Sequence, residues 1–157
     1  MEAWIASVIA VAGTLLGSIA THLFQRSHAA RGEQFMRGER LRVERMEAYS
    51  SFAQAVTELR RGIVSLWFHQ RKQPDSTDPA LRSSFVEADR LGAAAAHAQF
   101  RVQLVADDAQ LIGLASDVFG SIGALRDAPD RSTLAVHEAA IDGALDGFMN
   151  AAAQQLR

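Results

Sequence analysis

The side chains that could carry out acid–base or metal chemistry are not spaced to act together in this chain. It has 18 Asp and Glu residues, five His and no Cys. His137 is followed by Glu138, but neighbouring side chains on a helix point about 100° apart. A di-iron helical bundle needs Glu-x-x-His on two helices, and this spacing does not occur. These residues therefore predict no catalytic pair.

Other catalytic motifs are missing from the sequence as well. It contains no P-loop, GxGxxG, HExxH or GxSxG, and the absence of Cys excludes thiol nucleophiles and thiolate metal sites. His69 and His137 are expected at the same end of the fold, but two histidines without further ligands do not define a metal site. We therefore expect no catalytic residue, cofactor, bound metal or small-molecule substrate.

Two groups of acidic residues remain. Asp107 and Asp108 suit the start of a helix better than a cation site. Glu138, Asp142 and Asp146 are spaced by four and should repel one another weakly on one helix face. We call these three residues the acidic strip, and it is the candidate partner-binding surface in the sequence.

An apolar segment near the N-terminus is expected to fix the position of the rest of the chain at a membrane. Residues 4–24, WIASVIAVAGTLLGSIATHLF, contain no Asp, Glu, Lys or Arg. A helix of this length covers about 30 Å, the hydrocarbon thickness of a bilayer, so residues 1–24 are predicted to be a single transmembrane anchor. The alternatives are a signal peptide, which needs a basic start and a shorter apolar core, and a buried helix, which is rarely apolar on every face.

Basic residues after the apolar segment predict its orientation. They are Arg26, Arg31, Arg37, Arg40, Arg42 and Arg45, which three Glu residues reduce to a net charge of +3 over residues 26–45. Basic residues beside a span stay on the cytoplasmic side, which predicts an outside N-terminus and a cytoplasmic C-terminal domain. Residues 25–45 are predicted to form either a solvated stalk or a helix lying on anionic lipid. In both cases we expect this segment to make no contact with the helices of the remaining domain.

Small residues form a stripe along the predicted span. Ala6, Ala10, Gly13, Gly17 and Ala20 are spaced by three and four, and Gly13 and Gly17 make a GxxxG step. Such seams let helices approach closely in lipid, so we expect a homo-oligomer or pairing with another membrane protein. The alternative is that small residues are simply common in membrane spans.

Residues 46–157 are predicted to be one helical domain. Apolar residues recur at three and four positions, and no period-two pattern or hairpin turn predicts strands. Breaks at residues 72–79 and 128–130 divide the chain into four predicted helices. The first ends near Arg71 and the second spans residues 79–105. The third runs from Asp107 or Asp108 to Arg126, and the fourth starts near Ser132. Short loops make consecutive helices antiparallel, which predicts an up-down four-helix bundle.

The same periodicity predicts which side chains fill the bundle. The first helix should bury Met46, Tyr49, Phe52, Ala53, Val56, Leu59, Ile63, Leu66 and Trp67. The others should bury Leu81, Phe85, Ala88, Leu91, Ala95 and Val102; Leu111, Leu114, Ala115, Val118, Ile122 and Leu125; and Leu134, Ile141, Leu145, Phe148 and Leu156. With a net charge of −4 over residues 46–157, the domain offers no broad basic surface for nucleic acid.

The architecture also resembles a group of proteins. Residues 13–24, GTLLGSIATHLF, and 37–61, RGERLRVERMEAYSSFAQAVTELRR, are similar to uncharacterised small membrane-anchored helical proteins of actinobacterial type. This resemblance implies an anchor but no activity. We expect a non-enzymatic, membrane-tethered interaction or scaffold module. The alternative is a membrane-active or transfer-associated component, such as a plasmid-transfer, toxin or holin-like protein that assembles through its span.

Overall fold

The computed structural model describes the backbone of residues 2–72 and 78–156, and the side chains of residues 36–72 and 78–156. The helices are α1 (Glu2–Lys72), α2 (Pro79–Val105), α3 (Ala109–Ser121), α4 (Gly123–Arg126) and α5 (Arg131–Gln155). No strand occurs in the described part of the chain, so the predicted all-α class is confirmed. The chain divides into two compact units, residues 1–41 and residues 42–157.

Aspartates cap the first turns of three helices: Asp78 at α2, Asp108 at α3 and Asp130 at α5. The Asp78 carboxylate accepts from the backbone N–H of Ala80, and Pro79 occupies the first helical position. Asp108 accepts from Gln110 in the same way at the start of α3. Each carboxylate satisfies an N–H group that has no partner within its helix. These starts lie where the sequence predicts them.

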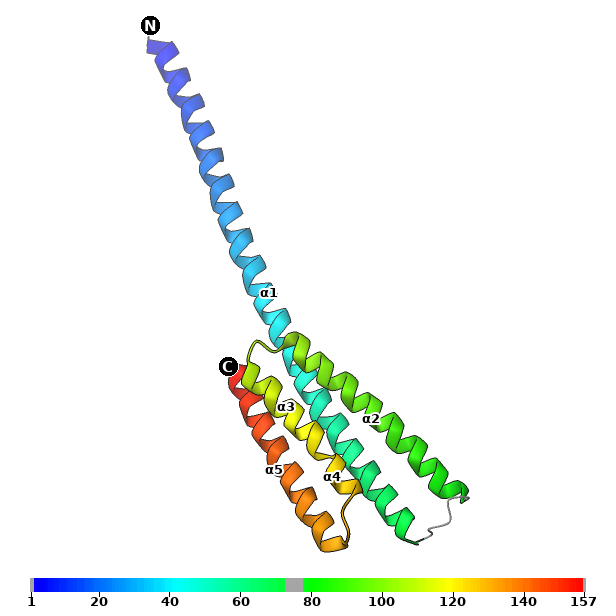
Figure 1. Ribbon diagram of the computed structural model, residues 1–157. Helices are drawn as coiled ribbons and strands as arrows, with labels where there is room; N and C mark the ends of the chain where they lie inside the picture. The colour runs from blue at the N-terminus through cyan, green and yellow to red at the C-terminus, as the bar shows by residue number, and fades with distance from the viewer. Residues whose placement is uncertain (1, 73–77, 157) are drawn as a thin grey trace. The chain divides into compact units, whose positions relative to one another are not determined.

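The third predicted helix is divided in two. We expected one helix through Arg126, but α3 ends at Ser121 and the four-residue α4 begins at Gly123. Ile122 between them is buried, and its N–H bonds to the Phe119 carbonyl, three residues back, in a tighter turn. Within residues 42–157, consecutive helices run in opposite directions, and α3 and α4 together take the place of one helix in a four-helix bundle (Figure 1).

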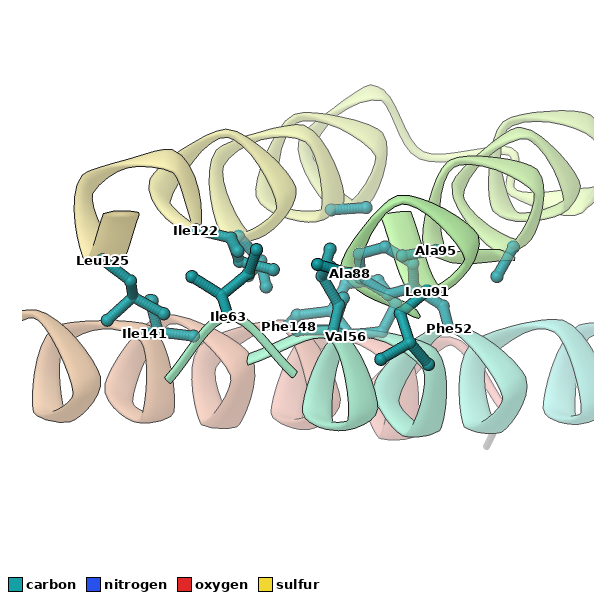
Figure 2. Packing of buried hydrophobic residues seen from close by; sticks show 14 of the residues in the cluster. Phe52, Val56, Ile63, Ala88, Leu91, Ala95, Ile122, Leu125, Ile141 and Phe148 are labelled. Atoms are coloured by element: carbon teal, nitrogen blue, oxygen red, sulfur yellow. The ribbon is translucent and has the colours of Figure 1, made fainter. Parts of the chain in front are cut away.

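The core of residues 42–157 is a single apolar cluster. Labelled side chains from α1, α2, α5 and the α3–α4 segment converge on a shared interior in Figure 2. Most of the predicted inward residues are buried there. Met46 is 54% exposed and Phe85 is 37% exposed, so these two predictions are wrong. Ala53, Leu114, Leu145 and Leu156 are only partly buried.

Gly62 lets α1 and α2 approach closely. A Cβ atom built at this position would lie 2.5 Å from Leu91 Cδ1, well inside van der Waals contact. Glycine is less favourable than alanine within a helix by about 1 kcal/mol, but here its missing side chain leaves room for Leu91. This glycine therefore has a packing role in the bundle.

The predicted anchor lies outside the residues whose side chains the structure describes. Among residues 36–72 and 78–156, no helix has a stretch long and apolar enough to span a bilayer. The apolar segment 4–24 and its small residues Ala6, Ala10, Gly13, Gly17 and Ala20 lie outside the residues whose side chains are described. Arg26 and Arg31 lie outside them as well.

Candidate functional site: a groove and an exposed face on helix α2

Arginines of α1 bind the C-terminal ends of two neighbouring helices. Arg45 Nε donates to the carbonyl oxygen of Val105, the last residue of α2, at 2.8 Å, and its guanidinium pairs with Asp107. Arg42 Nε donates to the carbonyl oxygen of Leu156, just after α5, also at 2.8 Å. Helix C-termini carry partial negative charge, so cations are favourable there. Residues 25–45 were expected to lack a bundle partner, and for Arg42 and Arg45 that expectation is wrong.

A matching contact lies at the opposite end of α1. Trp67 Nε1 and Arg71 Nη2 both donate to the carbonyl oxygen of Ala128, at 2.9 and 2.7 Å. The Arg71 guanidinium also lies 3.8 Å from the centre of the Trp67 ring, within the range of a cation–π contact. These polar contacts hold the α4–α5 connection against α1 and therefore have a structural role.

The acidic strip is interrupted by an ion pair. Asp142 pairs with Arg60 of α1 at 2.7 Å, so its charge is partly neutralised within the bundle. Glu138 is half-buried, whereas Asp146 is exposed. The three carboxylates therefore do not form one uniform acidic surface, and their role in partner binding remains a prediction.

One hollow in the described part of the chain is a groove lined by residues of α1, α2 and the α3–α4 segment. Its volume is about 630 Å³. Leu59 and Ile63 of α1 contribute to its lining. The remaining lining residues are Ala88, Asp89, Gly92, Phe119, Gly120, Ile122, Gly123, Arg126 and Asp127. Several of these are small, so little side-chain volume fills the space between the helices.

Three charged side chains that line the groove make no polar contact with the described part of the bundle. Asp89, Arg126 and Asp127 are exposed, and their side chains form no hydrogen bond or ion pair with another described residue. They are available to a molecule that approaches the groove. An apolar groove with a few charged groups is typical of sites for ligands or partner side chains.

Helix α2 also presents large apolar side chains to solvent, both near the groove and further along the helix. Phe100 is 59% exposed and Leu104 is 84% exposed, and Val86 lies on the same helix. Single exposed apolar residues are common on protein surfaces, but these follow helical spacing. We call the exposed residues Val86, Arg90, Ala93, His97, Phe100 and Leu104 the α2 outer face.

The histidines take no part in a metal centre within the described residues. The His69 ring lies 3.1 Å from the Ser84 hydroxyl, across α1 and α2, and His97 lies on the α2 outer face. No group of three or more His, Asp or Glu side chains in residues 36–72 and 78–156 is placed to hold a metal ion.

Residues 46–156 match the family model of the KilB plasmid transfer protein. The chain belongs to the KilB family. The match covers the bundle with its groove and α2 outer face, and it begins four residues after the boundary between the two compact units. No curated protein and no solved structure matches the chain. The KilB match identifies the helical domain and does not include the predicted anchor.

Proposed function

We propose that this KilB protein is a non-catalytic, membrane-tethered component of a plasmid transfer apparatus, and that its bundle binds other proteins. The observation that carries the proposal is the family match, because it covers almost the whole bundle and names plasmid transfer. The proposal joins the interaction module expected from the sequence to its transfer-associated alternative.

The character of the bundle surface supports a binding role. The α2 outer face has large exposed apolar residues, and the adjacent groove has charged residues without internal partners. Exposed apolar groups of this kind occur at protein–protein contacts. A non-catalytic role accords with the spacing of the acidic and histidine residues in the sequence.

The tether rests on sequence alone. Residues 4–24 are long and apolar enough to span a bilayer, and the arginines that follow favour a cytoplasmic bundle. A stripe of small residues along this segment supports association with a second span. The tether would hold the bundle at the membrane that a transferring plasmid must cross.

Plasmid transfer between cells tests the proposal directly. Three chains are compared in cells that lack the native protein: the full chain, a chain without residues 3–24, and one whose residues 3–24 are replaced by an unrelated single span. We expect transfer to fail without a span and to recover at least partly with the substitute. Full transfer by the truncated chain would contradict the tether, and normal transfer without any of the three chains would contradict the transfer role.

Topology and span association need separate measurements. A reporter fused to the C-terminus should be active only in the cytoplasm, and activity outside the cell would overturn the orientation. Cross-linking in membranes should weaken in Gly13→Leu and Gly17→Leu if the small-residue stripe drives association. Membrane leakage caused by residues 1–45 alone would favour the toxin or holin-like alternative.

A further inference from the structure

We propose that a second copy of this chain docks on the α2 outer face, with the two α2 helices antiparallel. The inference concerns the described bundle and does not depend on the membrane tether. It assigns the exposed apolar residues of α2 to a symmetric interface and places Phe100 of each copy beside the groove of the other.

The α2 outer face has the spacing of a coiled-coil seam. Its six residues are separated by four, three, four, three and four positions, and all six are exposed. They lie opposite the buried face of α2, which is formed by Leu81, Ala88, Leu91, Ala95, Ala98 and Val102. A helix with apolar residues at this spacing on two faces can pack against a second helix as well as its own core.

The pattern is complementary to itself when reversed. If two copies of α2 cross antiparallel near residue 95, Val86 lies level with Leu104 of the second copy. Arg90 then lies level with Phe100 of the second copy, and Ala93 with His97. Two apolar residues meet at each end, an alanine meets a histidine on either side of the centre, and a guanidinium meets an aromatic ring between them.

Charges beside the seam fit the same arrangement. Glu87 and Arg101 occupy the same flank of α2, on either side of the crossing point. In the antiparallel pair, Glu87 of one copy lies within about one helical turn of Arg101 of the other, and the two-fold symmetry repeats this contact. Both side chains are accessible, since Glu87 is 52% exposed and Arg101 is 43% exposed. Within one copy Glu87 pairs with Arg90 at 2.7 Å and Arg101 lies 3.7 Å from Glu47, so the contact across the dimer adds to these pairs.

The groove provides space beside the inserted aromatic ring. Asp89, which lines the groove, precedes Arg90 and therefore lies within about 1.5 Å of the level of Phe100 of the second copy. Alanines at 93, 94 and 96 let the helices approach closely there, because they carry little side-chain volume. The Phe100 ring, 59% exposed in a single copy, therefore lies beside Asp89 and the stem of Arg90 at the edge of the groove of the second copy.

A second copy fits these residues because one helix supplies both halves of every pair. An interface in which the same surface is used twice closes on itself and gives a dimer rather than a filament.

Cross-linking of the full-length chain in membranes tests the register. The chain has no Cys, so Val86→Cys and Leu104→Cys each introduce a single thiol. With a short bismaleimide, we expect differently tagged Val86→Cys and Leu104→Cys chains to cross-link to each other. Each variant should not cross-link to itself, because equivalent positions lie about 27 Å apart along the antiparallel pair. Self-cross-linking without the mixed product would show a parallel pair and overturn the proposal.

Charge reversal and an apolar control test the interface by a second route. In sedimentation of the detergent-solubilised full chain, Glu87→Arg and Arg101→Glu should each weaken the dimer at least tenfold, and the double variant should recover most of it. Phe100→Asp should also weaken it, whereas Val136→Asp, at a 65% exposed site on α5, should not. A wild-type monomer, or equal weakening by Phe100→Asp and Val136→Asp, would overturn the proposal.

Discussion

Arg45 of α1 donates a hydrogen bond from Nε to the carbonyl oxygen of Val105, the last residue of α2. The two residues are 60 positions apart in the chain, and the Arg45 side chain is only 16% exposed. The last carbonyl groups of a helix have no partner within it, so a neighbouring guanidinium satisfies one of them. This contact fixes the end of α2 against the long first helix.

Replacing Arg45 by Met should destabilise the bundle. The substitution keeps much of the apolar stem but removes the charged hydrogen bond, which we expect to cost about 1–2 kcal/mol. The free energy of unfolding in urea, followed by circular dichroism, measures the effect. Arg61→Met is the matched control, because Arg61 is exposed on the same helix and has no hydrogen bond to another described residue. Equal losses in the two variants would contradict the role of Arg45.

Trp67→Phe should destabilise the opposite end of the bundle. The change removes the indole donor to the Ala128 carbonyl and weakens the contact with the Arg71 guanidinium. We expect a loss of about 1–2 kcal/mol from these two effects, plus a smaller loss from the reduced ring size. Thermal unfolding of Trp67→Phe and Arg71→Met should show similar shifts. An unchanged unfolding temperature in Trp67→Phe would contradict this account.

Two glycines should respond in opposite ways to alanine. Gly143 lies on the exposed side of α5 and a Cβ atom there meets nothing within 4 Å, so Gly143→Ala should stabilise by about 1 kcal/mol. Gly62→Ala places its Cβ against the buried Leu91 side chain, and the overpacking should exceed the gain in helix propensity. Unfolding temperatures of both variants test the difference. Stabilisation by Gly62→Ala would show that Leu91 can move aside at no cost.

Local signals in the sequence predicted the helices well. Asp78 followed by Pro79 marks the start of α2, because the carboxylate caps the helix and proline suits its first turn. The spacing of apolar residues also predicted most of the core. Both signals are local, because each depends only on residues close together in the sequence. Phe85 was misassigned because α3 and α4 are too short to cover that part of α2, and a residue pattern does not report the length of its neighbour.

Contacts between distant residues were harder to predict. Nothing near Arg42 or Arg45 in the sequence shows that the ends of α5 and α2 will meet them, so both were assigned to a stalk. The groove likewise depends on how residues of α1, α2 and the α3–α4 segment come together in the fold. One signal was available: Phe100 and Leu104 are large apolar residues four apart that the inward pattern of α2 leaves out.

Protonation of Asp130 should make the bundle less stable in acid. Its carboxylate accepts from the Thr133 backbone N–H and the Ser132 hydroxyl, and these bonds lower the pKa of Asp130 to about 2. The carboxyl of an unfolded chain has a pKa of about 4. Ionised Asp130 therefore favours the folded state fully above about pH 5, and this contribution is lost as the pH falls toward 2.

Asp130→Asn isolates that contribution. Asparagine can still accept the Thr133 bond, but it carries no titrating charge, so the unfolding temperature of the variant should fall less than that of the wild type between about pH 5 and pH 2.5. Asp146→Asn provides the control, because Asp146 is exposed and forms no hydrogen bond with another described residue. If Asp130→Asn and wild type lose stability in parallel over this range, the acid sensitivity of the bundle arises from other carboxylates.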